Sequence, residues 1–186
     1  MSTNIYIDNY KQNPYGYLSR LYTQTSDSVP VTNTLVETSL LDGGLGTLSI
    51  PANMFQVGDS FRAVLTGHVS SVNNHKLRLR VKTGVVILAD TGDITMPATT
   101  NKNWKLEIDF TVRALGVAGV ATIVSGGNFV YSKDASNAFE GAGFSVLNNT
   151  TFDTTINNTL SITAQWNNAD PGDSIYSEIF ILNKTY

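Results

Sequence analysis

Residues 160–186 constrain the fold most, because they contain two strand-like patterns joined by a turn. Apolar and polar residues alternate through residues 160–166, which is the period of a β-strand with one buried face. Residues 170–173, with the sequence Asp-Pro-Gly-Asp, predict a tight turn of type II, in which the proline presets φ and the glycine tolerates positive φ. Residues 175–182 then predict a second strand that ends the chain.

This final strand is apolar on both faces. Ile175 and Ile179 fall on one side of a regular strand, and Tyr176 and Phe180 fall on the other. We expect such a strand to lie inside a sheet or against another subunit rather than to fray at an edge.

Composition excludes several classes of protein. The chain has 22 Thr and 18 Asn but only 3 Met among 186 residues, which favours β-structure over helices in a single domain. It has no cysteine, so disulfides, thiolate metal sites and cysteine nucleophiles are excluded. Its net charge of −3 argues against an ordinary nucleic-acid-binding protein. Because no apolar run approaches the roughly 20 residues of a membrane helix, no membrane insertion is expected.

Turn residues recur along the chain and divide it into about nine or ten predicted strands. Residues 73–75 and 125–128 are predicted hairpin turns, and residues 132–152 are expected to form a long surface excursion. The predicted strands include residues 60–70, 76–82 and 104–114. This spacing is typical of a sandwich or barrel, and an all-β single jelly-roll β-sandwich of antiparallel strands fits it best.

Residues 1–28 precede the regular pattern and form a predicted N-terminal arm, which leaves residues 29–186 for the jelly-roll domain. The arm carries five tyrosines, namely Tyr6, Tyr10, Tyr15, Tyr17 and Tyr22. Two interpretations remain open. The arm is either a partly ordered terminus or a segment that docks on a neighbouring subunit, where tyrosine gives contact area at low entropic cost.

A cationic row lies along one face of the predicted strand at residues 76–82. Its members are Lys76, Arg78, Arg80 and Lys82. Such a row could bind anions or phosphate. The favoured interpretation is a solvent-facing row paired across the sheet with carboxylates such as Glu107 and Asp109, because no aromatic residues interleave with it.

The remaining polar residues do not predict a catalytic or metal site. His68 and His75 have no further ligands at metal-binding spacing. Residues 90–93 could hold one Ca²⁺, but they lack the dense acidic spacing of a dedicated loop. The chain has neither a nucleophile elbow nor a phosphate loop. We therefore predict no enzyme, no cofactor and no catalytic residue, with a hydrolase that uses two facing carboxylates as a minor alternative.

Several segments are similar to a known family of proteins. They are residues 31–34, 37–40, 46–53, 57–61, 77–82, 89–92, 152–155, 158–160 and 162–166. Over residues 20–186 the chain resembles small virion-type structural proteins of giant DNA viruses, virophages and some phages. The resemblance implies a single jelly roll of the tumour-necrosis-factor or capsid type, in a penton, capsid-associated or fibre-head role. It carries over no active-site residues.

The function expected from this resemblance is that of a non-enzymatic viral structural protein that self-associates through its β-sandwich. Its location would be the virion, and the host cytoplasm during assembly. Its partners would be further copies of itself, with a trimer favoured over a pentamer, and other virion proteins. In a trimer of the tumour-necrosis-factor type, Tyr176, Phe180 and Tyr186 would line the contact.

The alternative function is a carbohydrate-binding or receptor-attachment module, with surface glycans as the partner. Exposed aromatic side chains at Tyr131, Phe139 or Phe144 would stack on a sugar. Asn137 and Glu140 would hydrogen-bond to its hydroxyl groups. The two functions are compatible, because attachment proteins bind sugars.

Overall fold

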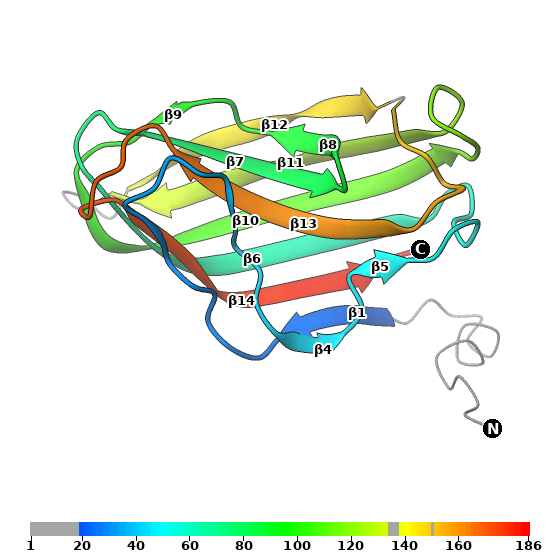
Figure 1. Ribbon diagram of the computed structural model, residues 1–186, viewed down its shortest axis with the longest axis horizontal. Coiled ribbons are helices and arrows are strands. Elements are labelled where there is room, and N and C mark those ends of the chain that lie inside the picture. The colour runs from blue at the N-terminus through cyan, green and yellow to red at the C-terminus, as the bar shows by residue number, and fades with distance from the viewer. Residues whose placement is uncertain (1–18, 134–137, 150) are drawn as a thin grey trace.

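The computed structural model describes residues 19–133, 138–149 and 151–186, and within these residues the chain forms two β-sheets and no helix (Figure 1). The strands are β1 (Ser19–Gln24), β2 (Val31–Thr32), β3 (Thr38–Ser39), β4 (Gly44–Gly46), β5 (Ser49–Ile50), β6 (Ser60–Ser71), β7 (Lys76–Thr83), β8 (Val86–Asp90), β9 (Ile94–Thr95), β10 (Thr99–Ala114), β11 (Thr122–Ser132), β12 (Phe139–Asn149), β13 (Asn158–Trp166) and β14 (Ser174–Lys184).

The larger sheet has eight strands in the order β12-β11-β10-β6-β14-β1-β4, with β2 also paired to β14. The smaller sheet has six strands in the order β3-β13-β7-β8, with β5 paired to β13 and β9 paired to β7. All of these pairings are antiparallel. The expected all-β sandwich is therefore confirmed. The strands outnumber the nine or ten expected because five of them, β2 to β5 and β9, have only two or three residues.

The core lies between the two sheets and follows the period-two pattern of the sequence. Alternate residues of the long strands point inward and are fully or almost fully buried. From β10 these are Trp104, Leu106, Ile108, Phe110 and Val112, and from β13 they are Leu160, Ile162, Ala164 and Trp166. Burial of each large apolar side chain stabilises the fold by about 1.5–3 kcal/mol.

The turn at Asn73–His75 joins strands of different sheets, because β6 belongs to the larger sheet and β7 to the smaller. The prediction of a turn is confirmed by Asn74, which has a φ of 66°, and by a 3.2 Å hydrogen bond from His75 N–H to the Val72 carbonyl. The prediction of a hairpin is wrong, since the flanking strands do not pair with each other.

The turn at residues 170–173 also crosses between sheets, from β13 to β14. Asp173 N–H donates to the Asp170 carbonyl at 3.1 Å, as a tight turn requires. Gly172 is not among the glycines with positive φ, so the predicted type II geometry is wrong. Its N–H instead donates to Asp170 Oδ1 at 2.8 Å, and this side-chain bond fixes the bend.

A β-bulge in β14 changes which residues share a face. Ser177 pairs with Gly67 and Ile179 pairs with Thr66, so Glu178 is an extra residue. Beyond this bulge the alternation is inverted. Ile175 and Phe180, assigned to opposite faces from the sequence, both point into the core, and Ile179 is 51% exposed. The strand is therefore buried on one face, although it does lie inside the sheet, between β6 and β1, as expected.

The predicted hairpin at residues 125–128 is wrong, because β11 runs through this segment without turning. Gly127 pairs with Ile108 on β10. A Cβ on Gly127 would lie 2.1 Å from the carbonyl oxygen of Glu107, so only glycine fits. The glycine permits a close approach between strands rather than a turn.

The expected surface excursion at residues 132–152 contains β12, which pairs along β11 and forms an edge of the larger sheet. The expectation of an irregular surface segment is wrong there, because glycines and small residues obscure the strand pattern in the sequence.

The N-terminal segment contributes a strand to the sandwich. Residues 19–24, which sequence analysis places in the arm, form β1 and pair with both β14 and β4. Tyr22 is buried, and its ring centroid lies 5.7 Å from that of Phe180. Any arm therefore ends before Ser19. The other arm tyrosines, Tyr6, Tyr10, Tyr15 and Tyr17, lie outside the described residues.

We expect Gly127→Ala to lower the free energy of unfolding by about 2–3 kcal/mol, because the new Cβ would separate β10 from β11. Gly143→Ala on β12 is the matched control, since nothing lies within 4 Å of a Cβ built at that position. Urea unfolding followed by tryptophan fluorescence measures both variants. Equal stability of the two would contradict the close approach at Gly127.

Candidate functional site

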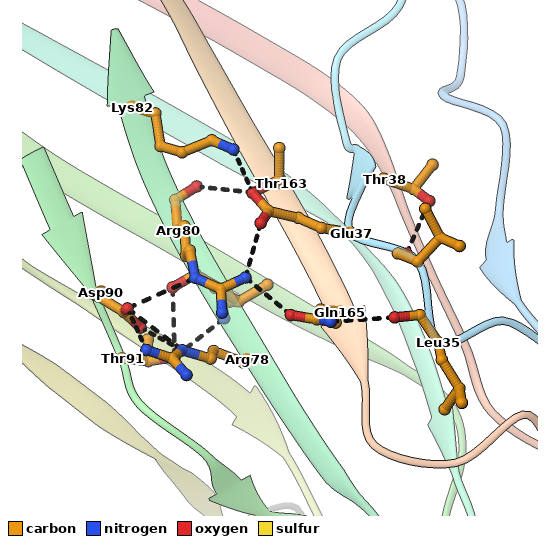
Figure 2. Close-up of polar contacts among 12 residues, drawn as sticks. Leu35, Glu37, Thr38, Arg78, Arg80, Lys82, Asp90, Thr91, Thr163 and Gln165 are labelled. Carbon is orange, nitrogen blue, oxygen red and sulfur yellow. Dashed lines mark hydrogen bonds and ion pairs between the residues drawn. The ribbon is translucent and has the colours of Figure 1, made fainter. Parts of the chain in front are cut away.

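The cationic row of β7 lies on the outer face of the smaller sheet and belongs to a polar network. Figure 2 shows Arg80 between two carboxylates, with Asp90 on the side of Arg78 and Glu37 on the side of Lys82. Arg78 donates to Asp90 through Nε at 2.9 Å and through Nη2 at 2.6 Å. Arg80 Nε lies 3.5 Å from the same carboxylate. Asp90 also accepts from the N–H of Gly92 at 2.8 Å. Its oxygens are thus occupied by the protein itself.

Glu37 lies in the segment before β3 and reaches the same face of β7. It accepts from Arg80 Nη1 at 2.8 Å, from the Thr163 hydroxyl at 2.6 Å and from Lys82 Nζ. Gln165 completes the network, because its Oε1 accepts from Arg80 Nη1 at 2.8 Å. Three strands are therefore connected by side chains above the sheet.

These contacts change the pKa values of both carboxyl groups. Burial alone would raise the pKa of Glu37, but the hydrogen bonds from Lys82 and Thr163 and the charges of Arg80 and Lys82 outweigh it, so that the pKa lies below its ordinary value. Burial alone would also raise the pKa of Asp90. The hydrogen bond from Arg78 and smaller contributions outweigh burial, so the pKa of Asp90 lies below its ordinary value. Both groups therefore remain ionised near neutral pH.

The carboxylates that pair with the row are not those expected. Glu107 and Asp109 lie on β10 in the other sheet. Glu107 pairs instead with Arg62 and, at 2.6 Å, with Lys105. The expectation of a paired, solvent-facing row is correct in kind, but the sequence could not identify Glu37, which lies far from β7 along the chain.

The two histidines lie in separate places. His75 Nδ1 lies 2.7 Å from Oδ2 of Asp173, a fully buried residue whose Oδ1 accepts from Val72 N–H at 2.9 Å. This pair connects the two turns that cross between the sheets. His68 stacks on Tyr176 on the outer face of the larger sheet, with ring centroids 5.8 Å apart.

No described group of three or more His, Asp or Glu side chains could hold a metal ion. At the alternative Ca²⁺ loop, residues 90–93, Asp90 is bound by Arg78 and Gly92 N–H. Asp93 lies 3.8 Å from Lys76 Nζ. These contacts make the loop a bend fixed by hydrogen bonds and ion pairs.

The residues of the carbohydrate-binding alternative are only partly available on the surface. Tyr131 is fully buried, and its hydroxyl donates to Glu140 at 2.7 Å, so the idea that its ring stacks on a ligand is wrong. Burial and this hydrogen bond raise the pKa of Tyr131. Phe144 is also buried, whereas Phe139 is 75% exposed. Asn137 lies outside the described residues.

The three residues proposed for an oligomer contact have different environments. Phe180 is fully buried in its own sandwich, so it is not a surface contact residue; the bulge in β14 turns it inward. Tyr176 is half-buried beside His68. Tyr186 is 82% exposed. A contact through Tyr176 and Tyr186 stays a prediction.

Exposed apolar side chains gather at one end of the sandwich. Sequence analysis singled out only Tyr186 among them, because the others lie in or next to loops. Backbone hydrogen bonds hold these loops together, among them Asn53 N–H to Thr154 O at 2.8 Å and Thr154 N–H to Gly116 O at 2.9 Å. Figure 1 shows these loops at the end of the sandwich where the C-terminus lies. We call this surface the apolar end, and its members are Met54, Val57, Leu115, Val117, Val120, Ile156 and Tyr186.

Comparison with known proteins adds no relative. No family model matches the chain, and no curated protein sequence matches it. The part of the chain that the structure describes contains no helix long and apolar enough to cross a membrane.

We expect Glu37→Gln to lower the free energy of unfolding at pH 7 by about 1–2 kcal/mol, because Arg80 and Lys82 lose a charged acceptor. A carboxyl group whose pKa is lowered by folding stabilises the protein above its unfolded pKa, near 4.5 for Glu37, and loses this effect as the pH falls through the folded value. The variant should therefore show a shallower loss of stability on acidification.

Urea unfolding between about pH 7 and pH 3 measures this effect. Asp109→Asn is the control, because Asp109 is an exposed carboxylate of β10 in the other sheet. An acid dependence that is the same in wild type and Glu37→Gln would contradict the role of the network.

Proposed function

We propose that this chain is a non-enzymatic structural protein of a virion and that it self-associates through the apolar end. The similarity of residues 20–186 to small virion-type structural proteins supports the class. The antiparallel sandwich is compatible with this class, since the chain crosses between the sheets at the β6–β7 and β13–β14 turns, although β10, β11 and β12 follow one another within the larger sheet. Its partners would be further copies of itself and other virion proteins.

The observation that carries this proposal is the concentration of large apolar side chains at one end of the molecule. Each member of the apolar end is at least 41% exposed, and Tyr186 reaches 82%. Scattered exposed apolar residues are normal, but a contiguous group usually marks an interaction surface.

A second copy of the chain is the occupant that this surface fits best. Residues 51–58 and 115–121 contain no charged side chain, and the loop that carries Ile156 adds one carboxylate, Asp153, so two such surfaces can meet with little like-charge repulsion. Ser19 pairs with Lys184 and so also lies at this end.

The polar clusters support a structural rather than a catalytic role. Glu37, Asp90 and Asp173 each accept hydrogen bonds from nearby side chains or backbone N–H groups, and these bonds connect strands or turns. The hydrogen bonds of these three carboxylates stabilise the fold.

The solution mass of the purified protein, measured by light scattering after size exclusion, tests this proposal. We expect a multiple of the 20.1 kDa chain mass, with three copies favoured over five. The double variant Val117→Asp with Ile156→Asp should give 20.1 kDa, because two buried charges per copy would oppose the contact. Circular dichroism should show an unchanged fold, since both side chains are exposed.

Val29→Asp is the matched control, because Val29 is 71% exposed near the start of β14, away from the apolar end. It should keep the mass of the wild type. A wild-type monomer, or a double variant with the wild-type oligomeric mass, would overturn the proposed contact.

A further inference from the structure

The outer face of the larger sheet carries an open hollow of about 330 Å³, between β6, β10, β11, β12 and β14. Its lining includes Thr66, Asn103, Lys105, Val130, Phe139 and Glu178. We propose that this hollow binds an oligosaccharide. The site is independent of the self-association proposed above, because it lies on a sheet face and the apolar end lies on loops.

Cross-strand pairing arranges the side chains around the hollow in a row. Asn103 pairs with His68, and His68 pairs with Tyr176. In the other direction the neighbour of Asn103, Trp104, pairs with Tyr131 of β11, and the next residue of β11, Ser132, pairs with Phe139. The row crosses four strand spacings of about 4.8 Å and so spans about 19 Å. Its length suits an oligosaccharide better than a single sugar ring.

Aromatic rings lie at both ends of this row. Phe139 is 75% exposed at the β12 end. At the β14 end, Tyr176 and His68 stack with an interplanar angle of 28°. The C–H face of a pyranose ring is apolar and packs on exposed aromatic rings in the way that other apolar groups do. The two ends therefore offer two stacking positions.

Hydrogen-bonding groups lie between the aromatic ends. The Asn103 amide and the Thr66 hydroxyl have no hydrogen-bond partner among the described residues. Glu178 Oε2 lies 3.1 Å from His68 Nδ1, but the geometry is not that of a hydrogen bond, so the carboxylate keeps its capacity to accept. Sugar hydroxyls both donate and accept, and this mixture of groups matches them.

Other classes of ligand fit this surface less well. Glu178 and the net charge of −3 disfavour phosphates and nucleic acids. Among the described residues that line the hollow, the one ammonium group is that of Lys105, and it is already paired with Glu107 at 2.6 Å. A peptide that adds a strand needs a free sheet edge; β12 is such an edge, but most of the hollow lies over β6, β10 and β14, which are interior strands.

The backbone beneath the hollow is held in an unusual geometry that brings Glu178 to this face. Glu178 is the extra residue of the β14 bulge, a feature that commonly redirects a side chain beside a functional site. Trp104 Nε1 donates to the carbonyls of His68 and Tyr176, each at 3.1 Å. A Cβ on Gly67 would lie 2.0 Å from the Tyr176 carbonyl oxygen, so the strands approach closely there. These contacts fix the hollow before any ligand binds.

The test uses the full-length protein on a glycan array, followed by titration of maltotriose, cellotriose, chitotriose and any array hit, monitored by amide chemical shifts. We expect at least one oligosaccharide to bind and to shift the amides of Thr66, Asn103 and Lys105. Phe139→Ala and Asn103→Ala should each weaken binding by about tenfold, because each removes one contact group from an exposed position.

Ile156→Ala, in the apolar end, is the matched control and should bind as the wild type does. The proposal is overturned if no oligosaccharide binds at millimolar concentration, or if Phe139→Ala and Asn103→Ala both bind with unchanged affinity. A lowered solution mass of Phe139→Ala would assign this face to a second copy of the chain and would also overturn the saccharide site. Self-association through the apolar end would be unaffected by a failure to bind sugars.

Discussion

The fold depends on the bulge at Ser177–Ile179 in β14, because this central strand must present one dry face to the smaller sheet. Ser177 is fully buried at the bulge, where its polar groups could not remain unpaired without a penalty of about 1–3 kcal/mol each. Three residues from the early part of the chain satisfy them. Ser177 N–H donates to Ser28 Oγ at 2.9 Å, Gln24 Nε2 donates to Ser177 Oγ at 3.0 Å, and Ser177 Oγ donates to the Leu40 carbonyl at 2.5 Å. Hydrogen bonds at the bulge thus connect β14 to residues 24–40 inside the sandwich.

The same bulge determines what the outer face presents. Without the extra residue, Phe180 would point to solvent and Ile179 into the core. With it, Phe180 packs against Tyr22, and Glu178 stands beside His68 on the surface. The proposed saccharide site and the apolar core therefore both depend on one inserted residue. The smaller sheet is stabilised differently. The ion pairs of Glu37 and Asp90 with arginines of β7 connect its strands across the outer face.

Sequence periodicity predicts the core well where strands are regular. The inward residues of β10 and β13 follow from strict alternation, because each side chain on a pleated strand faces the side opposite to its neighbours. The bulge could not be predicted, since a single extra residue inverts the alternation without any change in composition. The turn predicted at Gly126 and Gly127 is wrong because glycine occurs both in turns and where two strands approach closely. Only the position of β10 distinguishes the two cases. The partner of Arg80 was missed because Glu37 approaches it through the fold rather than along the chain.

The sequence also misplaces the candidate surfaces, since aromatic residue type does not reveal exposure. Phe180 and Tyr131 are buried, and Phe139 and Tyr186 are exposed. The most direct measurement of this account is thiol labelling of single-cysteine variants, which the absence of natural cysteines makes unambiguous. With the bulge, Ile179→Cys should react rapidly and Leu182→Cys should stay protected in the folded protein. A protected Ile179→Cys with a reactive Leu182→Cys would mean that β14 alternates without interruption, and it would contradict both the assigned core and the assigned outer face.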